Sequence, residues 1–324
     1  MNFVFDIDGT TSFNGMVIEP AIEREIYALL RAGHRVVFAS ARPVRDILPM
    51  LSEDVRTHSG LVLIGANGSL LYRDGQLRAR EHLDAHSYAK IRVLIEHHGL
   101  HYIVDSLESY AFDLPDAHVL VERLNPEGTD RLVSLKDLEN PVKIILLDIN
   151  NPHLYAELEE TIASLNLHVT KHQDATTSID LAPGGVHKVS ALPQALGTRP
   201  GEKPDPYIAF GNDMNDVGLL EGAQYAVAVG SHEALLPLAD LTVDPHPDAV
   251  AAAIRVLASS SACKKALYLY QADFNALFTI KALLTRNVRC SLKSDESSQN
   301  TPISHNFGYA LEVVSQNHLS AHNI

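Results

Sequence analysis

Asn2-Phe3-Val4-Phe5-Asp6-Ile7-Asp8-Gly9-Thr10-Thr11 is the stretch of sequence that decides the fold. A short apolar run without polar alternation is typical of a parallel strand that is covered on both faces. The run ends in two aspartates and a glycine, and ligands of open α/β sheets bind at the carboxyl ends of such strands. Two neighbouring carboxylates stay ionised at low cost only with a cation or a proton between them. The alternative is an ordinary Asx-type turn, since Asp, Gly and Thr are common turn residues.

Short apolar strands alternate with amphipathic helices up to about residue 75, and again from His187 onward. This rhythm is typical of right-handed βαβ units, so we predict an α/β fold with a doubly wound, mostly parallel sheet. The predicted strands are 35–39, 61–64, 207–210, 226–229 and 241–243, and the predicted helices are 20–33, 44–51, one from His187, 217–221, 232–238 and 249–257.

Residues of about 80–180 show a different pattern, with helices over 84–98 and 152–165 among the strands 102–104, 142–147 and 178–181. We interpret this segment as an inserted α+β domain, which places a ligand cleft between two domains. The predicted division is a core of 1–80 and 182–258, an inserted domain of 81–181, and a C-terminal extension of unknown role over 259–324 with one helix at 266–284.

The bulk composition limits the partners of the chain. Its 324 residues carry a net charge of −14 and are 46% apolar, which argues against nucleic acid or an anionic membrane as the main partner. A small anionic substrate is still compatible, because a bound metal can reverse the field inside a cleft. The N-terminus lacks the pattern of a secretory signal, and the most apolar run, Val142–Leu147, is too short to span a bilayer. We therefore predict a cytoplasmic protein without a membrane partner, and its oligomeric state stays open.

Four groups of polar residues follow predicted strands or begin helices on the same side of the sheet. They are Asp6 with Asp8, then Ser40, then Lys188 after Gly184-Gly185, and finally Gly211-Asn212-Asp213-Met214-Asn215-Asp216. Carboxylate and amide oxygens suit Mg²⁺, while hydroxyl, ammonium and backbone N–H groups bind phosphate oxygens. Each group alone has an ordinary explanation: a helix cap for Ser40, a surface charge for Lys188, and a helix N-terminus for Asn212–Asp216. All four together favour a phosphorylated substrate.

These motifs resemble those of the haloacid dehalogenase superfamily, and the insertion resembles the cap of its Cof-type sugar-phosphatase branch. Asn67-Gly68 after the third strand and Ser178–Pro183 before Lys188 are also similar to that branch. The resemblance covers residues 1 to about 258 and implies a Mg²⁺-dependent phosphatase that acts on small phosphorylated metabolites, with sugar phosphates as the leading class and cofactor phosphates as another.

The resemblance implies roles for individual residues. Asp6 is the expected nucleophile, and Asp8 is the expected general acid and then base. Ser40 and Lys188 are expected to hold the phosphoryl group. The expected Mg²⁺ ligands are Asp6, the backbone carbonyl of Asp8, and the fourth motif through Asn212 and Asp213.

One departure from the family leaves the metal ligands open. Many members have Asp where this chain has Asn212, so Asn212, Asp213 and Asp216 are all candidates for direct contact with the metal.

The remaining candidates concern the substrate and rival functions. Arg42, Asn67, Gly68 and Asn215 are predicted substrate-binding residues, although Arg42 could equally form a surface ion pair. Asp105 and Asp113 are candidates to face the cleft, whereas His82 and His86 lack the glutamate of a zinc-protease helix. Two alternatives stay open: a phosphosugar mutase of similar architecture, and a non-catalytic sugar-phosphate-binding protein.

Overall fold

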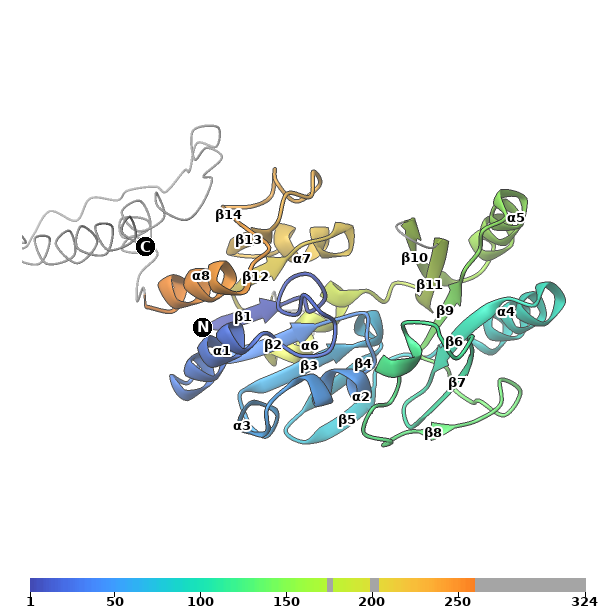
Figure 1. Cartoon of the computed structure of the whole chain (residues 1–324), viewed down its shortest axis with the longest axis horizontal. Coiled ribbons are helices and arrows are strands. Elements are labelled where there is room, and N and C mark those ends of the chain that lie inside the picture. The colour runs from blue at the N-terminus through green and yellow to red at the C-terminus, as the bar shows by residue number, and fades with distance from the viewer. Residues whose placement is uncertain (174–176, 199–203, 260–324) are drawn as a thin grey trace, which may run out of the picture. The chain divides into compact units, whose positions relative to one another are not determined.

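The computed structural model describes residues 1–173, 177–198 and 204–259, and its strands form two sheets (Figure 1). In the first sheet, of eight strands, β1 lies between two groups of parallel strands, and β4 and β5 add an antiparallel edge. Across this sheet the strands are β14 (Leu241–Val243), β13 (Tyr225–Val229), β12 (Tyr207–Gly211), β1 (Asn2–Phe5), β2 (Arg35–Ala39), β3 (Leu61–Gly65), β4 (Leu70–Arg73) and β5 (Gln76–Ala79).

Helices cover both faces of the first sheet, which explains the continuous apolar runs of its strands. Phe3 and Phe5 pack on one face and Val4 packs on the other, and all three are fully buried. The helices on the first face are α1 (Pro20–Arg31), α2 (Val44–Ile47), α3 (Glu53–Arg56) and α8 (Pro247–Ser259), and those on the second are α6 (Leu192–Leu196) and α7 (Val217–Glu221).

The helices differ from the prediction in three places, and a proline explains two of them. The predicted helix over 44–51 divides into α2 and a 3-10 turn, Leu48–Met50, which contains Pro49. The helix expected from His187 begins as the 3-10 turn Lys188–Ala191 and becomes α6 only afterwards. The predicted helix over 232–238 is wrong: the segment forms consecutive turns, since Pro237 has no N–H to continue a helical ladder.

The second sheet lies in the inserted segment and is mainly antiparallel, with one parallel pair, β7 and β8. One of its faces packs on two helices, α4 (Ala85–His98) and α5 (Pro152–Ala163). Across the sheet the strands are β10 (Leu167–Gln173), β11 (Thr177–Pro183), β9 (Lys143–Leu147), β6 (His101–Asp105), β7 (Ser109–Asp113) and β8 (Arg131–Leu132).

The register of the second sheet places a row of charged residues on its other face. Lys143 of β9 is the direct partner of Asp105 on β6, and Ile145 of β9 pairs with Ile103 on β6 and with Asp180 on β11. Because side chains alternate along a strand, these five residues share one face. We call it the polar cap face.

The predicted fold class is therefore confirmed: an α/β fold with a doubly wound, mostly parallel sheet and an inserted α+β unit. The predicted domain limits stay a prediction, and the predicted helix over 266–284 lies outside the described residues. In the described parts of the chain, no helix combines the length and the apolar character that crossing a bilayer requires.

The strand order places a crevice at the carboxyl end of β1. From β1 the chain proceeds to β2 and β3 on one side, and after the second sheet it returns to β12, β13 and β14 on the other. Ligands of doubly wound sheets bind at such a reversal of strand order.

Candidate active site at the end of strand β1

A buried lysine joins two carboxylates directly after β1. The Nζ atom of Lys188 lies 2.6 Å from Oδ1 of Asp6 and 2.8 Å from Oδ1 of Asp216. It also donates to Oδ1 of Asn215 at 3.2 Å. All three ionisable side chains of this strand-end cluster (Lys188, Asp6 and Asp216) are nearly inaccessible to solvent.

Burial and charge shift the ionisation of this strand-end cluster. Burial, together with the negative charge of Asp216, raises the pKa of Asp6 to about 7, although the Lys188 ammonium opposes the shift. Burial alone would lower the pKa of Lys188, but the carboxylates of Asp216 and Asp6 raise it above its ordinary value. The lysine therefore remains charged, and the Asp6 carboxyl needs further positive charge to remain ionised.

Asp8 lies on the other side of Asp6 and is half exposed. Its two carboxylate oxygens accept from Nε and Nη2 of Arg42 at 2.8 and 2.6 Å. Gly9 turns the chain here with φ +82°, and a Cβ atom at this position would lie 2.3 Å from Nδ2 of Asn212. Only glycine combines this left-handed backbone with so close an approach, so the turn brings the fourth motif against the first.

One end of the Asn212 amide faces three oxygen atoms. They are the backbone oxygen of Asp8 at 3.0 Å, Oδ2 of Asp6 at 3.1 Å and Oγ1 of Thr10 at 2.9 Å. Without a cation, the amide NH₂ group can turn to this end and donate to them. With Oδ1 turned to the same end, carboxylate, amide and backbone carbonyl oxygens lie together, and these are oxygen ligands that suit Mg²⁺. The donor set therefore fits a hard divalent cation.

No group of three or more His, Cys, Asp and Glu side chains forms a metal site among residues 1–173, 177–198 and 204–259. The arrangement at Asn212 is compatible with that finding, because it offers one carboxylate, one amide and one backbone carbonyl.

Ser40 and Asn67 lie around the turn that follows β2. The Ser40 hydroxyl oxygen accepts from the N–H of Arg42 at 3.1 Å, which leaves its own proton available for an acceptor such as phosphate. Asn67 N donates to the Ser40 carbonyl at 3.1 Å. Gly68 approaches the residue before Lys188 so closely that a Cβ atom would lie 2.4 Å from the His187 carbonyl oxygen.

The structure separates two predicted residues of the fourth motif. Asn215 contacts Lys188, as described above, whereas Asp213 turns elsewhere: its carboxylate accepts from Met214 N at 2.7 Å and lies 3.4 Å from Nε2 of His232. Asp216, one of the three candidates for the metal, is bonded to Lys188.

A cavity of about 350 Å³ opens beside Asp8. Its core side includes Arg42 and Pro43, and the second sheet contributes its polar cap face (Asp105, Lys143, Asp180, Ile103 and Ile145). Leu120, Arg123 and Leu124 complete the wall. Of the two aspartates expected to face a cleft, Asp105 lines this cavity, whereas Asp113 lies elsewhere on an exposed position of β7.

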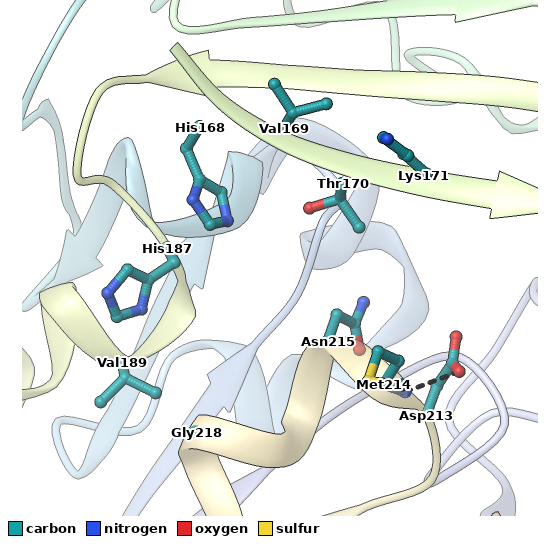
Figure 2. A pocket seen from close by; sticks show the side chains of 10 residues that line it. All are labelled: His168, Val169, Thr170, Lys171, His187, Val189, Asp213, Met214, Asn215 and Gly218. Carbon is teal, nitrogen blue, oxygen red and sulfur yellow. Dashed lines mark hydrogen bonds between the residues drawn. The ribbon is translucent and has the colours of Figure 1, made fainter. Parts of the chain in front are cut away.

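A second cavity of about 600 Å³ reaches the site from the side of Asn215. Figure 2 shows His168 and Thr170 of β10 pointing away from their strand into this cavity, His168 above His187 and Thr170 above Asn215. The rings of His168 and His187 lie 5.6 Å apart at their centroids. This cavity borders the fourth motif, while the smaller one borders Asp8.

Sequence reasoning missed a second buried charge cluster, at the contact between core and cap. We call it the junction cluster: Arg45 with Asp46, Asp105 and Asp130. Arg45 Nη2 lies 2.6 Å from Oδ1 of Asp105, and its guanidinium lies over the ring of Tyr110 at 4.4 Å. No local motif marks these residues.

Lys143 was also missed as a candidate, although a signal was present. It is a charged residue at the start of the most apolar run of the chain, and such a position predicts a buried charge. His82, in contrast, lies before α4 begins and is bonded to the carbonyl of Asn140, so it does not share a helix turn with His86.

Comparison with known proteins identifies relatives of this chain. Residues 3–254 match the family described as haloacid dehalogenase-like hydrolase. The chain is 26% identical to YkrA of Bacillus subtilis (strain 168) over 264 residues, which cover 78% of this chain and 96% of that protein. It is 24% identical to YbhA of Escherichia coli (strain K12), named pyridoxal phosphate phosphatase, over 70% of this chain and 86% of that one.

Solved structures agree in fold. A haloacid dehalogenase-like hydrolase from Bacteroides thetaiotaomicron has a TM-score of 0.65 at 20% identity, over 79% of this chain and 98% of that one. BT4131, described as a sugar phosphatase of subclass IIB, has a TM-score of 0.62 at 17% identity, over the same shares. At these identities the likeness shows the fold alone.

The chain belongs to the haloacid dehalogenase-like hydrolases, because the family match covers most of its length. The family predicted from the four motifs is thereby confirmed, and the inserted α+β unit agrees with the Cof-type branch.

Proposed function

We propose that this haloacid dehalogenase-like hydrolase is a Mg²⁺-dependent phosphomonoesterase that acts on small phosphorylated metabolites through an aspartyl-phosphate. The observation that carries the proposal is the environment of the Asp6 carboxylate. Lys188 lies 2.6 Å from its Oδ1, while its Oδ2 faces the Asn212 amide and the Asp8 carbonyl. One oxygen is thus oriented by a lysine and the other faces a fitting cation site.

Asp6 Oδ2, the backbone oxygen of Asp8 and Asn212 Oδ1 would hold the Mg²⁺ ion. When bound, the ion neutralises phosphate charge and lets an anionic nucleophile approach an anionic substrate. Asp213 we place outside this inner set, because its carboxylate is engaged with Met214 N and near His232.

Asp6 would attack phosphorus in the first half-reaction. A bond forms between its carboxylate oxygen and phosphorus, the ester P–O bond breaks, and the proton of Asp8 goes to the leaving oxygen. Lys188 and the Ser40 hydroxyl would hold the phosphoryl oxygens during transfer. In the second half-reaction Asp8 takes a proton from water, the water oxygen bonds to phosphorus, and the acyl-phosphate bond breaks to release inorganic phosphate and the Asp6 carboxylate.

Arg42 sets the condition under which Asp8 can act. The Arg42 guanidinium occupies both carboxylate oxygens of Asp8, although Asp8 must present an oxygen to the leaving group and then to water. As an acid Asp8 must carry a proton, so Arg42 has to leave it when substrate binds. The phosphoryl group of the substrate is the competing anion for the guanidinium.

The leaving alcohol would occupy the 350 Å³ cavity, because Asp8 lines that cavity and must reach the leaving oxygen. Its charged side chains, Asp105, Lys143 and Asp180, can bond to hydroxyl groups, so sugar phosphates stay the first substrate class that we propose. YbhA is named for pyridoxal phosphate and BT4131 for sugars, so cofactor phosphates are the second class to test. The cytoplasm stays the predicted location.

A substrate screen tests the proposal. The protein is incubated with p-nitrophenyl phosphate, sugar phosphates and pyridoxal phosphate, with Mg²⁺ or with EDTA, and released inorganic phosphate is measured. We expect release with Mg²⁺ and loss of release with EDTA. An isomeric sugar phosphate without inorganic phosphate would identify a mutase, and binding without turnover in Mg²⁺ would identify a sensor.

A further inference from the structure

A buried lysine of the cap reaches across to the phosphate-binding turn of the core, and the following inference rests on the proposed phosphatase function. Lys143 begins β9 on the polar cap face and is about 2% exposed. Its Nζ lies 2.8 Å from Oδ2 of Asp180 on the neighbouring strand β11. It also donates to the backbone carbonyl of Ala41 at 2.9 Å.

Ala41 is the central residue of the turn Ser40-Ala41-Arg42, which carries two of the proposed functional side chains. The carbonyl before it, of Ser40, accepts from Asn67 N at 3.1 Å. The side chain of Asn67 in turn donates to Oδ2 of Asp180 at 3.4 Å. Two successive carbonyls of the turn are thus held by groups that both contact Asp180.

The backbone beside this turn is strained, which shows that its surroundings determine it. Ala66 and Asn67 both have left-handed φ values, +50° and +55°. Such conformations cost about 1–3 kcal/mol each and persist where neighbouring contacts enforce them. Ala66 N also donates to the Arg42 carbonyl at 2.7 Å, so the strained segment contacts the turn at both ends.

We propose that Lys143 is a positioning residue through which the cap holds the phosphate-binding turn in its working geometry. Its contact with Ala41 exists only while β9 lies against the core, so the turn is held when the cap is closed and loosens when the cap opens. Lys143 thereby couples closure of the cap over the substrate to the orientation of the Ser40 hydroxyl and the turn N–H groups toward phosphate oxygens.

The test compares Lys143→Met with Lys136→Met, which removes an exposed lysine of the same cap. Two quantities are measured in Mg²⁺: kcat/KM for p-nitrophenyl phosphate and the inhibition constant of orthovanadate. Since small misplacements of binding groups cost up to about 100-fold, we expect Lys143→Met to lower kcat/KM about 10- to 100-fold and to weaken vanadate by a similar factor. Lys136→Met should change neither by more than about twofold, as a surface substitution.

A second readout separates positioning from general support of the fold. If Lys143 acts through the turn, its loss and the loss of the Ser40 hydroxyl affect the same contacts, so their effects overlap. We expect Lys143→Met in a Ser40→Ala background to cost clearly less than it does in the unaltered protein. An unchanged vanadate constant, or losses that simply multiply, would overturn the proposal.

Removal of one charge from a buried pair can unfold the site, so a second variant removes both charges of the Lys143–Asp180 pair. Lys143→Met/Asp180→Asn removes the contact to Ala41 without a buried unpaired carboxylate. It should fold, as thermal denaturation will show, and lose activity like the single variant, and a fully active double variant would overturn the proposal. If the unaltered protein releases no phosphate, the proposed function fails. An active protein that is indifferent to Lys143 defeats this inference alone.

Discussion

The strand-end cluster and the junction cluster are both buried sets of charges, yet their surroundings differ. In each, one cation faces more carboxylates than it can neutralise. The acids of the junction cluster are occupied by Arg45 and by the N–H of Asn125, which donates to Asp46 at 2.8 Å. In the strand-end cluster, Oδ2 of Asp6 instead faces Asn212 and the carboxyl end of β1. Burial and pairing alone therefore do not distinguish Asp6, the proposed nucleophile, from the acids of the junction cluster; its position at the strand end and the contacts of its Oδ2 do.

The largest expected contrast comes from Asp6→Asn. The amide cannot attack phosphorus, so we expect kcat for p-nitrophenyl phosphate to fall by at least about 10⁴-fold. The thermal midpoint at pH 8 should stay equal or rise, because the variant removes a carboxylate whose ionisation burial and Asp216 oppose. An active variant would refute Asp6 as nucleophile. A large loss of stability would show that the strand-end cluster, like the junction cluster, serves mainly to stabilise the fold.

Asp8→Asn sharpens the assignment of chemistry within the site. General acid catalysis contributes about 10²–10⁴-fold, and a poor leaving group depends on it most. We expect an alkyl phosphate to lose activity in this range and p-nitrophenyl phosphate, whose leaving group needs little protonation, to lose at least about tenfold less. The measurement is kcat/KM for both esters in parallel. Equal losses would show that Asp8 supports the site only through Arg42.

Arg45→Met, in the junction cluster, should have the reverse effect of Asp6→Asn: it should lower stability and largely spare activity. Three acids, Asp46, Asp105 and Asp130, then lose their common cation, so we expect the free energy of unfolding to fall by about 3–5 kcal/mol. Activity of the folded protein toward p-nitrophenyl phosphate should remain within about tenfold. The control is Arg56→Met, which removes the exposed pair of Arg56 with Glu127 and should cost about 0–1 kcal/mol. Urea denaturation measures the free energy of unfolding of both variants. Similar losses would show that the buried junction cluster contributes no more to stability than an exposed ion pair.

The strand-end cluster was predictable because its signals are local. Asp6 and Asp8 directly follow an apolar run, and Lys188 follows two glycines at a helix start. Each of these residues is therefore recognised from the sequence immediately next to it. The rule that strand ends meet at one edge of the sheet then brings them together without knowledge of the side chains.

The junction cluster was not predictable, because it depends on contacts between distant segments. Arg45 lies on helix α2 and Asp105 lies on β6 of the second sheet, and neither sits in a motif. Asp213 shows a subtler limit: beside Asn212 the sequence offers two acids, and only the turn geometry shows that Asp213 faces Met214 N while Asp216 faces Lys188.

The pH dependence of stability offers the finest distinction, through Asp46 of the junction cluster. Burial raises the pKa of Asp46 from 3.8 to about 6, although Arg45 opposes the shift. Between these two values the native protein binds more protons than the unfolded chain, so this carboxyl makes the free energy of unfolding fall as pH rises from about 4 to about 6. A shift of about two pKa units corresponds to at most about 3 kcal/mol.

Asp46→Asn removes this titration while its amide oxygen can still accept from Asn125 N. We expect the variant to match the unaltered protein below about pH 4 and to exceed it in stability above about pH 6, by up to about 3 kcal/mol. Asp116→Asn, at an exposed position of the cap, is the control and should leave the pH profile unchanged. Urea denaturation at several pH values gives the difference curve. The prediction fails if stability depends on pH in the same way for the unaltered protein and Asp46→Asn from pH 4 to 7. The junction cluster would then hold Asp46 ionised at no cost, and its electrostatics would differ from those of the strand-end cluster.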